Sequence, residues 1–176
     1  MNDQQYVESR ATTLTDGLAG LLPEAIDYVV ALPDSISSPL IKQVQRHPAI
    51  TYLQVVHESQ AVGLAAGLTL AGRVPIVLME NSGLRAAAES LARLVVLHQI
   101  HMVVVVSHRG GFGDPNWWAQ YHARHAEDVI KMFGFSYVRV ARMESIKQNV
   151  ADALAQVRTR TNSAVVALEP SALNGL

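Results

Sequence analysis

One carboxylate, Glu58, stands where an apolar stretch of the sequence gives way to a helical pattern crowded with small residues, at positions 56–67 (VHESQAVGLAAG). A helix N-terminus stabilises an anion, so Glu58 is an adequate first-turn residue without any function. Gly63 and Gly67, however, share one helix face, and each costs up to about 1 kcal/mol relative to alanine unless something packs closely there. The glycine pair therefore predicts a close backbone neighbour and favours more than a capping role for Glu58.

Two polar turns also follow apolar stretches and precede helical patterns. In the turn at positions 80–84 (ENSGL), either Asn81 or Ser82 caps the next helix through a side-chain oxygen, or the turn presents backbone N–H groups to a ligand. It is not a phosphate loop, because the glycine-rich run and the following lysine of that motif are missing. Earlier in the chain, Asp34 and Ser35 are helix caps first and substrate contacts second.

The longest irregular stretch, positions 108–118 (HRGGFGDPNWW), is the place to look for substrate contacts. Its two tryptophans, Trp117 and Trp118, should be buried against something, a partner chain included. His122 and His125 lie three residues apart at the start of a predicted helix, but no acidic residue is placed as a third ligand, so we expect no metal there. Proton transfer, substrate binding and plain solvent exposure remain open for this pair.

The elements that must position these residues alternate along the chain. Strand-length apolar runs, most of them rich in β-branched residues, occupy positions 26–32, 50–56, 75–79, 101–107, 136–140 and 164–168. Helical spacing of apolar residues covers positions 60–71, 84–98, 119–133 and 145–158. This order predicts an α/β fold in three layers, with six mostly parallel strands, helices on both faces and ligand groups at the carboxyl ends of the strands. A further amphipathic helix is expected over positions 5–22, ending before Pro23.

Length and composition restrict the class of protein. With 176 residues, the chain fits one domain spanning positions 1–176, and with no cysteine it has no disulfide framework or thiolate metal site. A net charge of −1 argues against nucleic acid as a partner. The start of the chain lacks the pattern of a signal peptide, and no apolar run reaches the roughly 18 residues of a membrane helix, so we expect a soluble, cytoplasmic protein. Charged residues make up only 16%, which is more easily explained if a partner covers some of the surface.

Taken together, four segments resemble the pyrimidine-binding (PYR) domain of thiamine-diphosphate-dependent decarboxylases. They are the Glu58 helix with its AVGLAAG continuation, the NSGL turn at 81–84, the PDS turn at 33–35 and the Arg-Gly pair at 109–110. The nearest likeness is to the α subunit of sulfopyruvate decarboxylase and the matching half of phosphonopyruvate decarboxylase, and it covers nearly the whole chain. The Glu58 segment is its most specific part.

The resemblance implies roles for individual residues. Glu58 would hydrogen-bond the pyrimidine ring nitrogen of thiamine diphosphate, which favours the imino tautomer that removes the thiazolium C2 proton, and this requires a carboxyl group in a dry pocket. Asn81, Ser82 and Gly83 would contact the cofactor. By the same analogy, the residues bordering the substrate, a 3-substituted pyruvate, are Ser35, His108, Arg109, Gly110, His122 and His125.

What the chain lacks implies a partner. In this family, the diphosphate and its Mg²⁺ are held by a Gly-Asp-Gly motif on a second domain, and the only similar string here is Gly113-Asp114-Pro115 in another context. The resemblance therefore implies a separate β subunit carrying that motif, in an α2β2 or larger assembly. The chain also departs from relatives at Gly111-Phe112-Gly113 and at Arg85-Ala86, so the substrate can differ from sulfopyruvate or phosphonopyruvate, and Arg109 or Arg85 could face an anionic substituent.

Two alternatives stay open at this stage. One is a carboligase subunit, similar to acetohydroxyacid synthase, because the cofactor site is common to both reactions. The other is a non-catalytic α/β regulatory subunit that kept the fold without turnover. A dinucleotide-binding domain is disfavoured, because no G-x-G-x-x-G follows the first strand.

Overall fold

The computed structural model describes residues 22–112 and 114–173, and within them the chain forms one six-stranded parallel sheet in the order β2-β1-β3-β4-β6-β5. The strands are β1 (Tyr28–Ala31), β2 (Thr51–Gln54), β3 (Pro75–Glu80), β4 (Val103–Ser107), β5 (Ser136–Val140) and β6 (Ala164–Leu168). All six predicted strands and their parallel direction are confirmed. The helix expected over positions 5–22 lies outside the described residues, apart from Leu22.

The composition of the central strands explains why they lie in the middle of the sheet. Strands β4 (VVVVS) and β6 (AVVAL) are buried at every position, and β3 is buried at all but its last residue, Glu80. Side chains of a strand point alternately to its two faces, so a strand that is apolar at every position must be covered on both sides. The edge strand β2 is not buried at any position.

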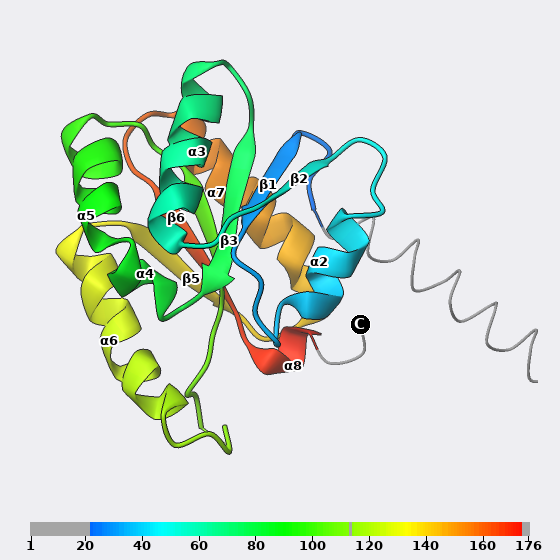
Figure 1. Cartoon of the computed structure of the whole chain (residues 1–176), viewed down its shortest axis with the longest axis vertical. Helices are drawn as coiled ribbons and strands as arrows, with labels where there is room; N and C mark the ends of the chain where they lie inside the picture. The colour runs from blue at the N-terminus through cyan, green and yellow to red at the C-terminus, as the bar shows by residue number, and fades with distance from the viewer. Residues whose placement is uncertain (1–21, 113, 174–176) are drawn as a thin grey trace, which may run out of the picture.

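Two layers of helices supply this cover (Figure 1). Helices α2 (Ser38–Val44), α7 (Ile146–Arg158) and α8 (Pro170–Leu173) share one apolar core with the sheet. On the other face lie α3 (Glu58–Leu70), α4 (Gly83–Ala86), α5 (Ala88–Ser90), the π-helix η1 (Leu91–Leu97) and α6 (Ala119–Met132). A short 3-10 turn, η2 (Met143–Ser145), precedes α7. The predicted three-layer α/β/α arrangement is therefore confirmed.

One predicted helix differs from expectation. Positions 84–98 form α4, α5 and η1 rather than a single α-helix, because Ala87 leaves the helical region (φ −93°, ψ 5°) and the backbone after Ser90 widens to a π-helix. Leu91 and Val95 nevertheless stay buried against the sheet. The apolar spacing predicted which face is buried, but it carried no signal for the change of helix type.

The strand order indicates where along the edge of the sheet a ligand site can form. The chain passes from β1 outward to β2 and then back across β1 to β3, so the helices that follow β1 and β3 lie on opposite faces of the sheet. The loops after these two strands diverge, and such a switch point at the carboxyl edge is where open α/β sheets bind ligands. A second divergence occurs between β4 and β6. In the part of the chain that the structure describes, no helix combines the length and the hydropathy needed to span a membrane.

Candidate active site at the carboxyl edge of the sheet

Glu58 and the turn after β3 are in direct contact, although they are far apart in the sequence. Helix α3 begins at Glu58, after His57, whose side chain accepts a hydrogen bond from the Ser59 backbone N–H at 3.1 Å. A Cβ atom at Gly83 would lie 2.7 Å from Glu58 Cγ, so only glycine allows α4 to approach this closely. The Ser59 hydroxyl also donates to the Ala86 carbonyl at 3.2 Å. Glu58 and Gly83, both predicted site residues, thus form one unit.

The described residues do not enclose the Glu58 carboxylate. The residue is half-buried, and no side chain among residues 22–112 and 114–173 forms a hydrogen bond or ion pair with it. The dry pocket expected around this carboxyl group therefore needs a cover from elsewhere.

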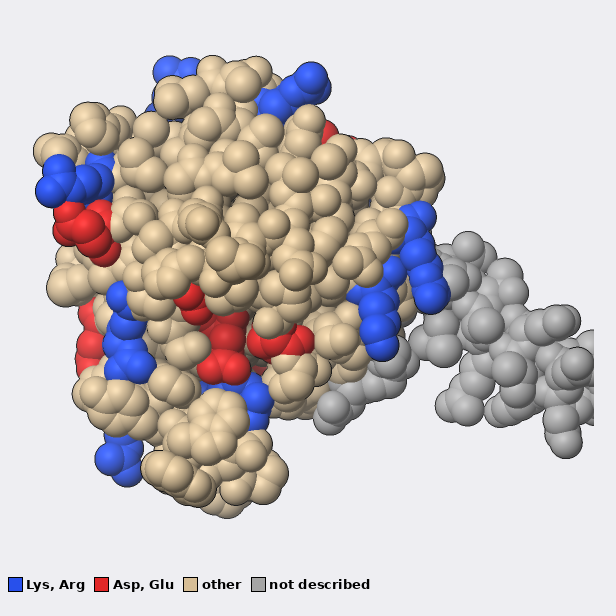
Figure 2. Space-filling model, viewed as in Figure 1, with Lys and Arg blue, Asp and Glu red and all other residues tan. Residues whose placement is uncertain are grey.

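Helix α3 has an exposed face beside this carboxylate. Within the described part of the chain, no heavy atom lies within 4 Å of a Cβ placed on Gly63 or Gly67, so the close neighbour expected at these glycines is not among the described residues. Leu64 and Leu70 are exposed on the same helix. Figure 2 shows that the surface over α3 is almost free of charged side chains, whereas charged atoms gather lower on this face. An uncharged, glycine-lined helix face is a surface that a second chain can approach closely.

The turn after β3 is held by its neighbours rather than by helix caps. The Asn81 side chain, only 1% exposed, donates through Nδ2 to the Arg109 carbonyl at 2.9 Å, and its Oδ1 is buried without a partner among the described residues. The Ser82 hydroxyl donates to Glu80 Oε1 at 2.9 Å. Neither side chain caps α4, so the interpretation of Asn81 or Ser82 as a helix cap is wrong.

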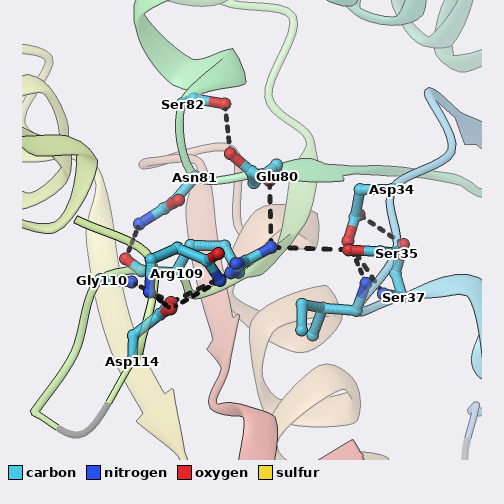
Figure 3. Close-up of polar contacts among 11 residues, drawn as sticks. Asp34, Ser35, Ser37, Glu80, Asn81, Ser82, Arg109, Gly110 and Asp114 are labelled. Carbon is cyan, nitrogen blue, oxygen red and sulfur yellow. Dashed lines mark hydrogen bonds and ion pairs between the residues drawn. The ribbon is translucent and has the colours of Figure 1, made fainter. Parts of the chain in front are cut away.

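The turn after β1 is ordered by Asp34. Its Oδ1 accepts hydrogen bonds from the backbone N–H groups of Ile36 at 2.8 Å and Ser37 at 2.9 Å, and its Oδ2 accepts from the Ser37 hydroxyl. Asp34 therefore orders the turn ahead of α2, whose N-cap residue is Ser37 and has no side-chain cap, so the interpretation of Asp34 as a helix cap is wrong. Ser35 instead points its hydroxyl toward Arg109, whose Nη1 lies 3.5 Å away, which brings the turn after β1 to the loop after β4 (Figure 3).

Arg109 is the centre of a buried charge cluster (Figure 3). Its side chain is 6% exposed, its Nε donates to Asp114 Oδ2 at 3.0 Å, and its Nη1 lies 3.9 Å from Glu80 Oε2. The guanidinium also stacks 4.9 Å from the centre of the Trp118 ring. The Arg109 hydrogen bond, with further donors from Asn116 and Gly110, holds the pKa of Asp114 well below its usual range.

The contacts around Arg109 bear on two predictions from the sequence, anion binding by Arg109 and a substrate contact by Gly110. Because Arg109 already pairs with Asp114 and lies near Glu80, its charge is compensated inside the chain and it is poorly placed to bind an anionic substituent. Gly110 is required by the backbone: its φ is 83°, and a Cβ there would lie 1.9 Å from the Ala119 carbonyl oxygen. Glu80 and Asp114 were not among the predicted site residues, although Asp followed by Pro and Asn is a turn signal that indicates a structural role for Asp114.

His108 lies beside a second feature of this edge, a cavity of about 460 Å³. The ring is buried, and its Nδ1 has no partner among the described residues. Burial lowers the pKa of His108, and the positive charge of Arg139 lowers it further. Arg139 itself is bound to Glu169 at 2.8 Å across the cavity lining. At neutral pH the His108 ring is therefore an uncharged hydrogen-bonding group next to a hollow at the β4–β6 divergence.

The structure separates the two histidines of α6. His122 Nδ1 lies 2.9 Å from Arg85 Nη2, and Arg85 stacks 4.7 Å from the Tyr121 ring centre, so His122 is tied to α4 and thus to the Glu58 side. His125 is instead 3.6 Å from Asp128 on its own helix. Within residues 22–112 and 114–173, no three side chains of His, Asp or Glu are grouped to hold a metal ion.

The described part of this chain leaves most of the aromatic residues of the fourth loop exposed, so burial against a partner stays a prediction. Trp117 is 83% exposed and Phe112 is fully exposed, whereas Trp118 is partly covered by Arg109 and His122. Trp118 therefore packs the loop against the rest of the domain. Trp117 and Phe112, which we call the rim, are exposed apolar side chains at the carboxyl edge. Burying such large rings contributes strongly to protein interfaces, so the rim is a candidate contact for a second chain.

Comparison with known proteins places this arrangement in a family context. A family described as the thiamine pyrophosphate enzyme, N-terminal TPP binding domain, matches residues 12–128. The sulfopyruvate decarboxylase subunit alpha of Methanothermobacter thermautotrophicus is 30% identical over 150 residues, which are 85% of this chain and 90% of that subunit. Phosphonopyruvate decarboxylase of Streptomyces viridochromogenes is 36% identical over 104 residues, 59% of this chain and 25% of that protein.

A more distant relative is a synthase. The 2-succinyl-5-enolpyruvyl-6-hydroxy-3-cyclohexene-1-carboxylate synthase of Listeria innocua is 28% identical over 158 residues, 86% of this chain but 26% of that protein. The similarity thus extends over most of a relative named as a subunit and over about a quarter of two longer relatives.

Proposed function

Because this chain belongs to the thiamine pyrophosphate enzymes, as their N-terminal TPP binding domain, we propose that it is the α subunit of a two-subunit, thiamine-diphosphate-dependent 2-oxo acid decarboxylase. Its substrate in this proposal is a 3-substituted pyruvate such as sulfopyruvate or phosphonopyruvate. The printed names of its relatives, sulfopyruvate decarboxylase subunit alpha and phosphonopyruvate decarboxylase, support the decarboxylase assignment.

The observation that carries the proposal is the contact between Glu58 and Gly83 beside an uncovered helix face. The residues present fit the aminopyrimidine end of the cofactor: a half-buried carboxylate is in contact with a glycine whose Cβ would displace it, and the same helix exposes Gly63 and Gly67 farther along. In this proposal, Glu58, Ser82 and Gly83 border the pyrimidine on one side, with Asn81 beneath them, and a second chain covers the other side.

When bound, thiamine diphosphate supplies a carbon nucleophile and the electron sink that accepts the electron pair released with carbon dioxide. The contribution of this chain is proton handling and orientation. Glu58 would hold a proton at a carboxyl oxygen and exchange it with the pyrimidine ring nitrogen, and cover by a second chain would exclude water and strengthen that hydrogen bond. Gly83 would keep Glu58 in position, because a larger residue there would push the carboxylate away.

On the substrate side, we propose contacts from Ser35, His108, Gly110 and His122, with His125 farther away because it pairs with Asp128. We propose that Arg85, and not Arg109, contacts the anionic substituent of the substrate. Arg85 has no carboxylate partner among residues 22–112 and 114–173; its neighbours are His122 and Tyr121. An uncompensated guanidinium suits a sulfonate or phosphonate group.

The proposed partner is a β subunit with a Gly-Asp-Gly motif that holds the diphosphate and Mg²⁺, in an α2β2 or larger assembly. It would cover the α3 face together with the rim formed by Phe112 and Trp117. Relatives named as alpha subunits support the existence of a partner.

Enlarging Gly67 tests whether a partner covers α3. We expect Gly67→Ala and Gly67→Leu to leave the isolated chain folded and up to about 1 kcal/mol more stable, because both residues favour a helix interior over glycine. Association with the β subunit should weaken progressively from alanine to leucine, because the proposed partner would fill the space beside Gly67 that the described residues leave open. Thermal unfolding and analytical ultracentrifugation measure the two effects. If Gly67→Leu assembles with the β subunit as well as the unaltered chain does, α3 is not part of the interface.

Product analysis of the reconstituted complex tests the reaction itself. With sulfopyruvate, phosphonopyruvate and pyruvate as separate substrates, we expect carbon dioxide and the corresponding aldehyde, with the anionic substrates preferred. Carbon–carbon bond formation as the main outcome would instead identify a carboligase, the alternative that the Listeria synthase favours. No turnover with any 2-oxo acid would identify a non-catalytic subunit.

A further inference from the structure

A second hollow lies at the amino edge of the sheet, opposite Glu58. Strands β3, β4 and β6 are neighbours in the sheet, so the turns that lead into them lie side by side. Between these turns is a cavity of about 480 Å³, within the range of small-molecule sites. Thr69 and Leu70 of α3 and Leu154 and Val157 of α7 contribute to its walls. None of the residues assigned to the carboxyl-edge site lines this cavity.

The ionisable side chains that line this cavity are all arginines or histidines. Each of the three turns contributes basic or imidazole side chains, namely Arg73, His98, His101, Arg158 and Arg160. No Asp or Glu of the described chain lines it, although the whole chain carries a net charge of −1. Figure 2 shows Lys and Arg side chains standing at the upper edge of the view, the amino edge of the sheet.

Two of the guanidinium groups are not compensated. Arg73 lies 3.8 Å from Asp27 and is thus partly neutralised. Arg158 and Arg160, by contrast, form no ion pair with any residue in 22–112 or 114–173 and are exposed. Like charges gathered around a hollow repel one another and raise the local concentration of anions.

The backbone conformation of the turns around the cavity is an independent observation. Two of these turns hold a residue other than glycine where glycine would be less strained. Among the described residues, four helices are followed, two positions after their last residue, by a residue with positive φ, the left-handed conformation in which glycine is the least strained choice. After α3 and α6 that residue is glycine, Gly72 (φ 76°) and Gly134 (φ 69°). After η1 and α7 it is Gln99 (φ 57°) and Arg160 (φ 56°), and both of these line the cavity. The arginine therefore occupies a position where glycine would fold more easily.

We propose that the amino-edge cavity binds the phosphate or diphosphate group of a small metabolite between Arg158, Arg160 and Arg73. Guanidinium groups match phosphoryl oxygens in geometry and charge. The apolar walls from Leu70, Leu154 and Val157 would accommodate the uncharged part of the ligand. This site is separate from the carboxyl edge, and its ligand would bind whether or not the proposed decarboxylase reaction is correct.

Titration calorimetry of the full chain with inorganic diphosphate, without Mg²⁺, tests the site. We expect a single site with a Kd below about 1 mM at low ionic strength, weakening as salt is added. Arg158→Gln should weaken binding about 10-fold or more, the effect of losing one hydrogen bond to a charged group. Glu58→Gln should bind diphosphate like the unaltered chain.

Arg160→Gly is the decisive variant, because it relieves the backbone while removing the charge. We expect a folded chain with equal or higher melting temperature and diphosphate binding weakened about 10-fold or more. Gln99→Gly is its control: it relieves the same type of backbone conformation but keeps the charge, so diphosphate binding should persist. Unchanged binding in Arg160→Gly, or no binding by the unaltered chain below about 10 mM, would overturn the proposal.

ADP serves as a second ligand that carries the same diphosphate with an added apolar surface. Binding tighter than inorganic diphosphate would support the site and assign the apolar walls to the organic part of the ligand. Equal binding would support a site for the phosphate groups alone. Binding of ADP that is insensitive to both Arg158→Gln and Arg160→Gly would place it elsewhere and contradict the proposal.

Discussion

Replacing Glu58 by glutamine is expected to lower kcat of the assembled enzyme by about 10²-fold or more, the size typical for losing a proton-transfer group. Glutamine keeps the size and one hydrogen-bonding oxygen of glutamate, but its carboxamide cannot exchange a proton with the cofactor. Folding and assembly should be unaffected, because Glu58 forms no ion pair or hydrogen bond within the described chain. Steady-state kinetics of the reconstituted complex, together with its sedimentation profile, gives both readouts.

Glu144→Gln is the matched control for this variant. Glu144 is also a carboxylate near a helix start, but it is exposed, and its ion pair within residues 22–112 and 114–173 is with exposed Arg142 at 3.6 Å. We expect full activity from it. If Glu58→Gln retains activity close to that of the unaltered complex, Glu58 has no catalytic role and the regulatory-subunit alternative becomes the better account.

Replacing Arg109 by glutamine should have the largest effect on stability. The change leaves the nearly buried carboxylate of Asp114, only 7% exposed, without its cation, and Glu80 loses the same neighbour. Breaking one side of a buried ion pair costs about 3 kcal/mol or more. Urea unfolding of the isolated chain measures the loss, and Arg142→Gln, which breaks an exposed pair, should cost less than about 1 kcal/mol. Equal costs for the two variants would refute the structural role of Arg109.

The same pair predicts acid sensitivity. Because the folded pKa of Asp114 lies below its ordinary value, the pair contributes fully above the unfolded pKa of about 4. That contribution is lost as the pH falls from about 4 toward the folded pKa. Arg109→Gln should therefore show a smaller loss of stability over this acid range than the unaltered chain.

The sequence predicted the layers of the fold well because they depend on local patterns. Six apolar runs became the six strands, since residues apolar on both sides require helices on both faces. The break of the predicted helix at Ala87 was not predicted, because a change from α to π geometry leaves the apolar spacing almost unchanged.

The site was predictable only where one segment carried the signal by itself. Glu58 followed from its strand-to-helix position and from the family resemblance. The roles of Glu80 and Asp114 depend on Arg109, which joins the loop after β4 to the strand β3 and to Ser35, 74 positions earlier in the chain. Such contacts depend on strand order, which the order of elements along the chain does not specify. The same reason explains why the amino-edge cavity had no sequence signal.

Gly63 and Gly67 carry a prediction that the described residues of this chain do not fulfil. Their cost in a helix predicted a close neighbour, and within the described residues no neighbour approaches them. Phe112 and Trp117, on the loop after β4, are also exposed among the described residues. The half-buried Glu58 and the uncovered α3 face are the two features that a second chain would complete.

Titration of thiamine diphosphate with Mg²⁺ shows whether this chain supplies only one half of a cofactor site. Calorimetry should detect at most weak binding to the isolated chain, because the proposed diphosphate and Mg²⁺ ligands belong to the partner. The same titration of the complex reconstituted with the Gly-Asp-Gly subunit should give tight binding. Submicromolar binding by the isolated chain alone would contradict the account.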